Sequence, residues 1–226
     1  MNSAIIAAAG AGKRLAGDRP KQFLELAGVP IIIHTLRAFE RCDAIHEIVV
    51  VLPSAEIPGF LATLEQHNLR KFAQAVPGGQ TRAESVWCGL NAVNPEAAIV
   101  AIHDAVRPLV TPDEIARTVQ GAEERGAAIL VAPVVDTIKE VSANQIVRTL
   151  DRGQLRRAMT PQCFSRGLLR QAYEGINVHD PALTDDGLLI ERMGAAVMAI
   201  EGSTRNIKIT CREDLAIAEA LLSATG

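Results

Sequence analysis

The sequence predicts an α/β fold built on a doubly wound, mostly parallel β-sheet. Short apolar segments such as residues 47–53 (EIVVVLP) and 127–134 (AAILVAPV) recur along the chain, with helical periodicity between them. Continuous apolar runs are typical of strands buried on both faces, as in parallel sheets covered by helices. A glycine turn follows the first run, at the strand end where such sheets bind ligands. The 226 residues suffice for one domain with a full core.

The predicted elements alternate in order along the chain. Strands are expected at residues 4–9, 47–53, 72–76, 97–105, 127–134, 195–202 and 206–210, and helices at residues 30–42, 57–67, 82–93, 111–125, 165–176, 184–194 and 212–222. The helix from Thr111 is the best bounded, because Thr111 can cap it, Pro112 suits its first turn and Gly126 ends it. Lys208 would lie on the polar side of its strand. No repeat or linker interrupts the pattern, so residues 1–226 are expected to form a single domain.

Residues 136–152 depart from this pattern. They alternate apolar and polar residues on both sides of Ser142, Ala143 and Asn144, which indicates an antiparallel hairpin attached to an otherwise parallel sheet. The edges of such a hairpin would be unpaired in a monomer. We therefore expect it to be a dimerisation hairpin that packs against a second copy of the chain.

The composition excludes several classes of function. The formal net charge is -3 and aromatic residues make up 3% of the chain, which disfavours a nucleic-acid surface and leaves a small anionic ligand as the expected partner. The four cysteines are scattered singly, without the spacing of a zinc site or a disulfide framework. No apolar segment is long enough to span a bilayer and no signal peptide is evident, so a cytoplasmic location is expected.

The loop after the first predicted strand is a candidate phosphate site. Gly10 and Gly12 let a turn aim successive N–H groups at an anion. The cations of the loop are Lys13, Arg14, Arg19 and Lys21. The loop is not a Walker motif, because Arg14 stands where Ser or Thr is required, and Leu15 replaces the third glycine of a dinucleotide fingerprint. On these residues alone, an ordinary turn with solvated cations remains an equal alternative.

Two residues at another predicted strand end could join this loop. Asp104 could bind Mg²⁺, which is commonly held by one or two carboxylates together with substrate phosphates, or it could cap a turn. His103 is expected to be a packed, hydrogen-bonded neighbour rather than a catalyst. An arginine cluster follows the hairpin, and its spacing favours a solvated face: Arg152, Arg156 and Arg157.

Eight blocks of sequence, in their order and spacing, resemble the 2-C-methyl-D-erythritol 4-phosphate cytidylyltransferases. The blocks are AAAGAGKRL, PKQF, GGQTRAESV, HDAVRP, APVVDTIK, LDRGQLRRAMTPQ, TDD and NIKIT, and together they cover nearly the whole chain. The resemblance implies a Rossmann-like nucleotidyltransferase sheet with a protruding β-hairpin arm. It also implies a homodimer with shared active sites.

The resemblance further implies a reaction and the residues that serve it. The phosphate of methylerythritol phosphate would attack the α-phosphorus of CTP, with Mg²⁺ as cofactor, in non-mevalonate isoprenoid biosynthesis. Arg14 and Lys21 would stabilise the transition state, and Asp104 would hold the metal. The CTP site would comprise Ala8, Ala9, Gly10, Gly12, Gly79, Ser85 and Asp104. The second substrate would be positioned by Lys208 and, from the second subunit, by Arg107, Thr137, Arg152 and Thr160.

Two other functions remain open on the sequence. Ribitol-5-phosphate cytidylyltransferases share the chemistry, but their first loop usually resembles AGGKGTRM rather than AAAGAGKRL. A non-catalytic nucleotide sensor or glycosyltransferase-like binder could use the same scaffold, although binding alone does not require transition-state cations. Gln80 stands where some relatives carry an acid and Glu84 replaces a common Asp, which affects the expected contacts to cytosine and ribose.

Overall fold

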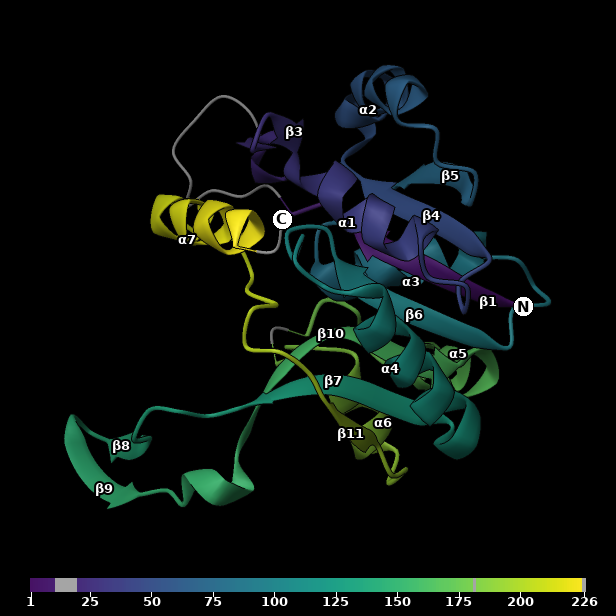
Figure 1. Ribbon diagram of the computed structural model, residues 1–226. Coiled ribbons are helices and arrows are strands. Elements are labelled where there is room, and N and C mark those ends of the chain that lie inside the picture. The colour runs from purple at the N-terminus through teal and green to yellow at the C-terminus, as the bar shows by residue number, and fades with distance from the viewer. Residues whose placement is uncertain (11–19, 181, 225–226) are drawn as a thin grey trace.

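A seven-stranded sheet forms the centre of the fold (Figure 1). The computed structural model describes residues 1–10, 20–180 and 182–224. In spatial order the strands are β11 (Met198–Glu201), β7 (Ala127–Pro133), β10 (Arg156–Ser165), β6 (Ile99–Asp104), β1 (Asn2–Ala7), β4 (Glu47–Leu52) and β5 (Phe72–Pro77). Only β10 is antiparallel to its neighbours in this sheet, β6 and β7. The predicted doubly wound, mostly parallel α/β fold is therefore confirmed.

Helices cover both faces of the sheet because successive strand side chains point to opposite faces. Ile6 of β1 belongs to a buried cluster with α1 (Ile31–Glu40), α2 (Ile57–Leu64) and α4 (Pro112–Arg125). Ile5 belongs to a second cluster with α3 (Arg82–Ala92), α5 (Arg166–Glu174) and α6 (Gly187–Arg192). Both side chains are wholly buried, so the apolar run of β1 has the environment expected of a central parallel strand.

A third cluster joins the end of the chain to its beginning. Helix α7 (Arg212–Ser223) buries Ala218 against Leu26 and Ile209. Leu26 lies in a small hairpin formed by β2 (Glu25–Leu26) and β3 (Val29–Pro30). This layer lies near the carboxyl ends of the parallel strands, beside the site described below (Figure 1). No helix in the described ranges is both long and apolar enough to cross a membrane.

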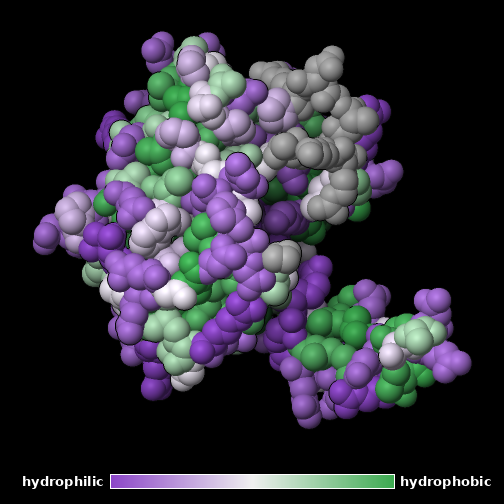
Figure 2. All heavy atoms as spheres, turned by 180° about the vertical axis from the view of Figure 1, so that it is seen from behind, coloured by the Kyte–Doolittle hydropathy of each residue, from purple (hydrophilic) through white to green (hydrophobic). Residues whose placement is uncertain are grey.

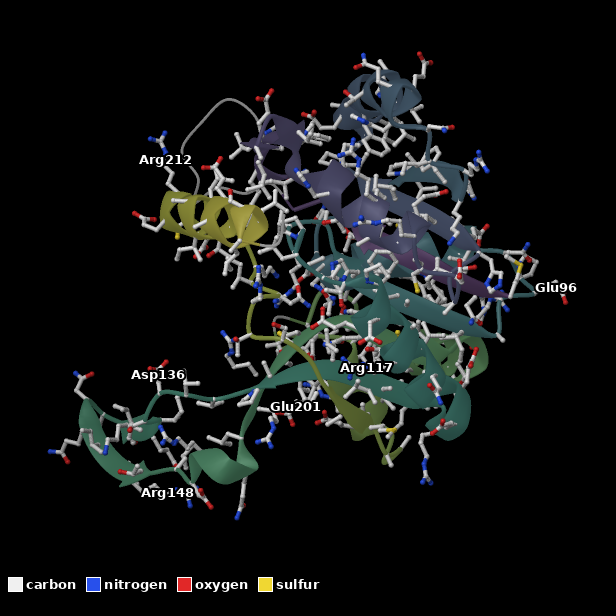
Figure 3. The ribbon with its side chains drawn as sticks, in the orientation of Figure 1. Glu96, Arg117, Asp136, Arg148, Glu201 and Arg212 are labelled. Atoms are coloured by element: carbon white, nitrogen blue, oxygen red, sulfur yellow. The ribbon has the colours of Figure 1, made fainter. Side chains whose placement is uncertain are left out.

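Strands β8 (Lys139–Ser142) and β9 (Gln145–Thr149) form an arm that projects away from the sheet (Figure 1). The turn between them has positive φ at Ala143 and Asn144, 47° and 64°, which suits the twist of a two-residue hairpin. Figure 3 shows Asp136 and Arg148 on the arm, clear of the main sheet. The predicted protruding hairpin arm is thus confirmed, and it forms a two-stranded sheet separate from the main one.

The antiparallel strand of the main sheet is β10, which the sequence did not predict. Pro161 lies within it, and proline lacks the N–H that a central strand donates to its neighbours. The structure accommodates Pro161 where the pairing of β10 with β7 shifts register, between Ala158 and Gln162. The irregular pairing explains why a proline-containing segment can occupy a central position.

The predicted strand at residues 206–210 is instead irregular backbone. Its polar groups bond to a loop rather than to a strand: Arg107 Nη1 donates to Asn206 O at 2.9 Å, and Ile209 N–H donates to Val106 O at 2.9 Å. The strand prediction was wrong because the apolar side chains of this segment pack under α7. Lys208 is therefore held beside the loop that follows β6.

Candidate active site

A pocket of about 360 Å³ lies at the carboxyl ends of β1 and β6. Its walls bring together eight residues that the sequence predicted to bind, position or stabilise a substrate: Ala8, Ala9, Gly10, Lys21, Gly79, Ser85, Asp104 and Lys208. Gly12 and Arg14, which were predicted for the same site, lie outside the described residues. The pocket occupies the position where open α/β sheets bind ligands.

One wall of the pocket is a loop that lies close to the end of β1. This close approach is possible because Gly78 has no side chain. A Cβ atom at Gly78 would lie 2.4 Å from the Cβ of Ala9 and 2.8 Å from the Oγ of Ser85. Gly79 N–H donates to Ser85 Oγ at 3.2 Å, and this hydroxyl donates to Thr81 O at 2.8 Å. Ser85 is 4% exposed, so its hydroxyl stabilises the loop from the buried side.

The same loop leads into the N-terminus of α3. Glu84 N–H donates to Thr81 Oγ1 at 3.0 Å, which caps the helix, and Thr81 Oγ1 donates to Val178 O at 2.7 Å. Gln80 N–H donates to Glu84 Oε2 at 2.6 Å. The Glu84 carboxylate therefore bonds the loop backbone. The positive end of the α3 dipole lies at the pocket wall, which favours an anionic ligand.

A short 3₁₀ turn, Lys21–Phe23, forms another part of the wall. Gln22 Nε2 donates to Ala8 O at 2.7 Å from a side chain that is 1% exposed. Lys21 Nζ lies 3.4 Å from Ile209 O, beside the segment that carries Lys208. Gln22 was not predicted as a site residue, although it lies in the PKQF block, and its bond to Ala8 ties Lys21 to the end of β1.

Asp104 is surrounded by three cations. Its Oδ2 lies 3.0 Å from Lys208 Nζ and 3.3 Å from Arg107 Nε, and its Oδ1 lies 3.7 Å from Arg82 Nε. Burial acts to raise the pKa of Asp104, but the charges of Arg82, Lys208 and Arg107 outweigh it and hold the pKa well below its usual range. Asp104 is therefore an ionised carboxylate at neutral pH.

A second, smaller pocket of about 190 Å³ adjoins the first. The two pockets share Arg82, Asp104 and Lys208. Arg107 and Thr160 line the second pocket from the same chain, where Thr160 is 4% exposed. Within one chain, β10 pairs directly with β6 and places Thr160 beside Asp104. The contribution of these two residues from a second subunit stays a prediction.

His103 organises the backbone behind the second pocket. The side chain is wholly buried, which lowers the pKa of His103 to about 3 and keeps the ring neutral. Its Nε2 lies 3.2 Å from Arg107 O, which can only accept, so Nδ1 accepts from the Thr160 hydroxyl at 3.0 Å. Thr160 Oγ1 in turn accepts from Asp104 N–H at 3.1 Å. His103 is thus a packed, hydrogen-bonded neighbour of the site.

Thr137 and Arg152 lie on the arm, and neither lines a pocket described for this chain. Both side chains are exposed, and Arg152 Nη1 donates to Val135 O at 2.5 Å. The described ranges also contain no cluster of three or more His, Cys, Asp or Glu side chains suited to a metal. A metal at Asp104 could take its other ligands from substrate phosphates and water.

The family described as 2-C-methyl-D-erythritol 4-phosphate cytidylyltransferase matches residues 2–224. This chain belongs to that family. The relative from Pelotomaculum thermopropionicum is 42% identical over 224 residues, which are 98% of this chain and 94% of that protein. The relative from Bacillus cytotoxicus is 42% identical over 222 residues, 98% of each chain. Both relatives are named 2-C-methyl-D-erythritol 4-phosphate cytidylyltransferase.

The comparison of folds gives the same result. The crystal structure of 4-diphosphocytidyl-2C-methyl-D-erythritol synthase from Anaerococcus prevotii matches with a TM-score of 0.88 at 30% identity. The match covers 99% of this chain and 96% of that one. The cytidylyltransferase fold therefore extends over the arm and α7 as well as the main sheet.

Sequence reasoning missed Arg82 as a site residue of this cytidylyltransferase. Arg82 lines both pockets, and its Nη1 lies 2.7 Å from Asp186 Oδ2. The signal was present in the GGQTRAESV and TDD blocks, but a pairing between segments 104 residues apart cannot be read from either block alone.

Proposed function

We propose that this chain transfers the cytidylyl group of CTP to 2-C-methyl-D-erythritol 4-phosphate. The products are 4-diphosphocytidyl-2-C-methyl-D-erythritol and pyrophosphate, in the non-mevalonate route to isoprenoids. The observation that carries the proposal is the junction of two pockets at Asp104, Lys208 and Arg82. A transfer between two anionic substrates needs adjacent sites with fixed cations at their boundary.

The arrangement suits an in-line displacement at phosphorus. An oxygen of the methylerythritol phosphate attacks the α-phosphorus of CTP and forms a new P–O bond. The bond from the α-phosphorus to the oxygen that bridges it to the β-phosphorus breaks, and pyrophosphate leaves with that electron pair. Lys21 in the larger pocket would balance the charge on the nucleotide, and Arg14 would assist it. Lys208 and Arg107 would hold the attacking phosphate in the smaller pocket.

Mg²⁺ fits this site through Asp104. The side chain is ionised and lines both pockets, and Mg²⁺ is often bound by a single carboxylate together with substrate phosphates. The ion would supply charge neutralisation on the triphosphate. Lys208 and Arg107, which contact Asp104 in the structure, would then be released to contact the incoming phosphate.

We also infer that the arm joins two copies of the chain. Its large apolar side chains are unusually exposed: Val135 is 69%, Val141 58%, Ile146 66% and Val147 57% accessible. Figure 2 shows hydrophobic side chains gathered on the projecting arm. Exposed apolar patches of this kind are typical of interfaces, and a two-fold axis would cover both arms at once. Thr137 and Arg152 would then reach the second pocket of the partner.

The function is tested by measuring pyrophosphate release with CTP and Mg²⁺. We expect release with 2-C-methyl-D-erythritol 4-phosphate, much less with ribitol 5-phosphate, and none without an alcohol phosphate. Replacement of CTP by ATP or GTP should also abolish most of the release. Equal turnover with ribitol 5-phosphate would reassign the substrate, and CTP binding without any turnover would favour a nucleotide sensor.

A further inference from the structure

A fully buried carboxylate lies directly behind the wall that the two pockets share. Asp186 is 0% exposed and belongs to the TDD block, to which the reaction assigns no role. Tyr173 O–H donates to Asp186 Oδ1 at 2.6 Å, and Arg82 Nη1 lies 2.7 Å from Asp186 Oδ2. Burying a charge removes it from water, and attraction to an opposite charge often fails to offset that cost. Stability alone therefore does not account for the pair.

The Arg82 side chain extends from this ion pair to the two pockets. Its side chain is 28% exposed, whereas that of Asp186 is 0% exposed. The guanidinium therefore reaches from the buried carboxylate to the shared wall, where its Nε lies 3.7 Å from Asp104 Oδ1. Burial acts to lower the pKa of Arg82, but Asp186 and Asp104 outweigh this effect and raise it, so the cation is permanent.

Asp186 itself is fixed by its backbone. Gln162 Oε1 accepts from the N–H groups of Asp186 and Gly187, at 3.0 Å and 3.2 Å. A Cβ at Gly187 would lie 2.2 Å from Ile129 Cδ1, so the start of α6 packs directly on β7. Asp186 Oδ2 has no well-aligned hydrogen bond within the described ranges. Arg82 is thus held mainly by charge attraction to a rigid anion.

We propose that Asp186 is a positioning residue for the cytidylyl transfer: it holds the Arg82 guanidinium at the wall common to the two pockets. There the planar cation faces the phosphoryl oxygens while one P–O bond forms and the other breaks. A cation fixed in advance needs no reorganisation as charge develops in the transition state. The Tyr173 hydroxyl donates to the other oxygen of the same carboxylate, Oδ1. This inference rests on the proposed function.

The test is a double-mutant cycle between Asp186→Asn and Arg82→Ala, with kcat from pyrophosphate release and the CTP dissociation constant from calorimetry. Asparagine keeps the shape and can still accept from Tyr173, but it removes the charge. We expect Asp186→Asn to lower kcat by on the order of tenfold, while CTP affinity changes by less than about threefold. In the Arg82→Ala background the same substitution should lower kcat no further, because the two residues act as one unit.

Glu114→Gln is the matched control. Glu114 is also a buried carboxylate, 3% exposed, but it caps α4 through Thr111 N–H at 2.9 Å and lines neither pocket. We expect this variant to lose stability and to keep its kcat. Tyr173→Phe provides a second cycle if Asp186→Asn does not fold, with a smaller loss of kcat that also disappears in the Arg82→Ala background.

The outcomes separate this inference from the proposed function. If the unaltered chain releases no pyrophosphate, the proposed function fails and this inference fails with it. The chain could instead be active while the double variant loses kcat by the product of the two single losses. In that case Asp186 does not act through Arg82. An unchanged kcat in Asp186→Asn would also overturn the positioning role.

Discussion

Asp104 has more cations around it than one carboxylate can neutralise. Lys208, Arg107 and Arg82 all lie within 3.7 Å of its oxygens. This arrangement keeps Asp104 charged and keeps three long cationic side chains close to one point. A metal ion can therefore replace a cation beside Asp104, and a phosphate can replace Asp104 as the partner of that cation.

We predict that Asp104→Asn lowers turnover by on the order of a hundredfold and weakens the dependence on Mg²⁺, because the amide carries no charge for the metal. Removal of metal with EDTA should abolish release in the unaltered chain, and added Mg²⁺ should restore it. The binding of Mn²⁺ in the presence of CTP, measured by electron paramagnetic resonance, provides a readout independent of activity. Asp113→Asn, on the exposed face of α4, is the control. An unchanged metal titration would remove Asp104 from the metal site.

A substitution at Gly10 tests the need for space in the pocket separately from the stability of the fold. Among the described residues, a Cβ at Gly10 would meet nothing within 4 Å, and Gly10 lines the larger pocket. Gly10→Ala should therefore fold normally but weaken CTP binding by roughly tenfold, because the methyl group occupies space meant for the ligand. Gly59→Ala, also in open space but on α2, should bind CTP as before. Equal CTP affinity in the two variants, measured by calorimetry, would contradict this prediction.

Helix α7 positions Lys208 through the residues that begin it. Asp214 Oδ2 accepts from Thr210 N–H and Thr210 Oγ1, both at 2.7 Å, and from Cys211 N–H at 3.0 Å. These bonds fix the chain just after Lys208. Burial acts to raise the pKa of Asp214, but the hydrogen bonds from Thr210 and Cys211 outweigh it and lower the pKa to about 2.

We predict a pH-dependent stability difference between the unaltered chain and Asp214→Asn. The folded pKa lies below the ordinary value of 3.8, so the ionised cap stabilises the fold above that pH and loses its effect as the pH falls toward about 2. At neutral pH the variant should lose about 1 kcal/mol of unfolding free energy, as for other helix caps. Urea unfolding at several pH values measures the gap, which should narrow in acid.

Glu219→Gln is the control for this prediction, because Glu219 lies exposed on the same helix. It should show no comparable loss at neutral pH. A gap between Asp214→Asn and the unaltered chain that stays constant down to acid pH would show that the carboxylate charge is not responsible.

The sequence allowed most elements to be predicted, because apolar runs and caps are local signals. The capped helix from Thr111 was predicted to end at Arg125, as it does in α4. Strand β10 and the irregular segment at residues 206–210 could not be predicted, because their pairing depends on segments far away in the chain. The same limit explains the site: residues such as Ser85 follow from motifs, whereas the contact between Arg82 and Asp186 exists only in the folded chain.

The arm has a consequence for the assembled protein. If it crosses to a second copy, each active site uses Lys208 of one subunit and Arg152 of the other. We predict that Lys208→Ala and Arg152→Ala homodimers are each nearly inactive, and that subunit exchange between them restores about a quarter of the activity, because half of the dimers then have one intact site. Pyrophosphate release after exchange, with exchange confirmed by native mass spectrometry, is the measurement.

A second mixture is the control for this experiment. Lys208 and Arg107 contact Asp104 within one chain, so mixed dimers of Lys208→Ala and Arg107→Ala contain no intact site and should stay inactive. If exchange between Lys208→Ala and Arg152→Ala restores nothing, Arg152 serves its own subunit and the arm does not complete a neighbour's site.

The place of β10 between β6 and β7 affects how the chain folds as it leaves the ribosome. Strands β5, β4, β1 and β6 can pair as soon as residue 104 has emerged, but the far edge of β6 stays open until β10 arrives about 60 residues later. At ordinary rates of translation this interval lasts roughly 3 to 12 s. During it the nascent chain exposes the unpaired edge of a strand whose first four residues are apolar. A chain truncated before β10 would therefore leave this edge of β6 without its partner strand.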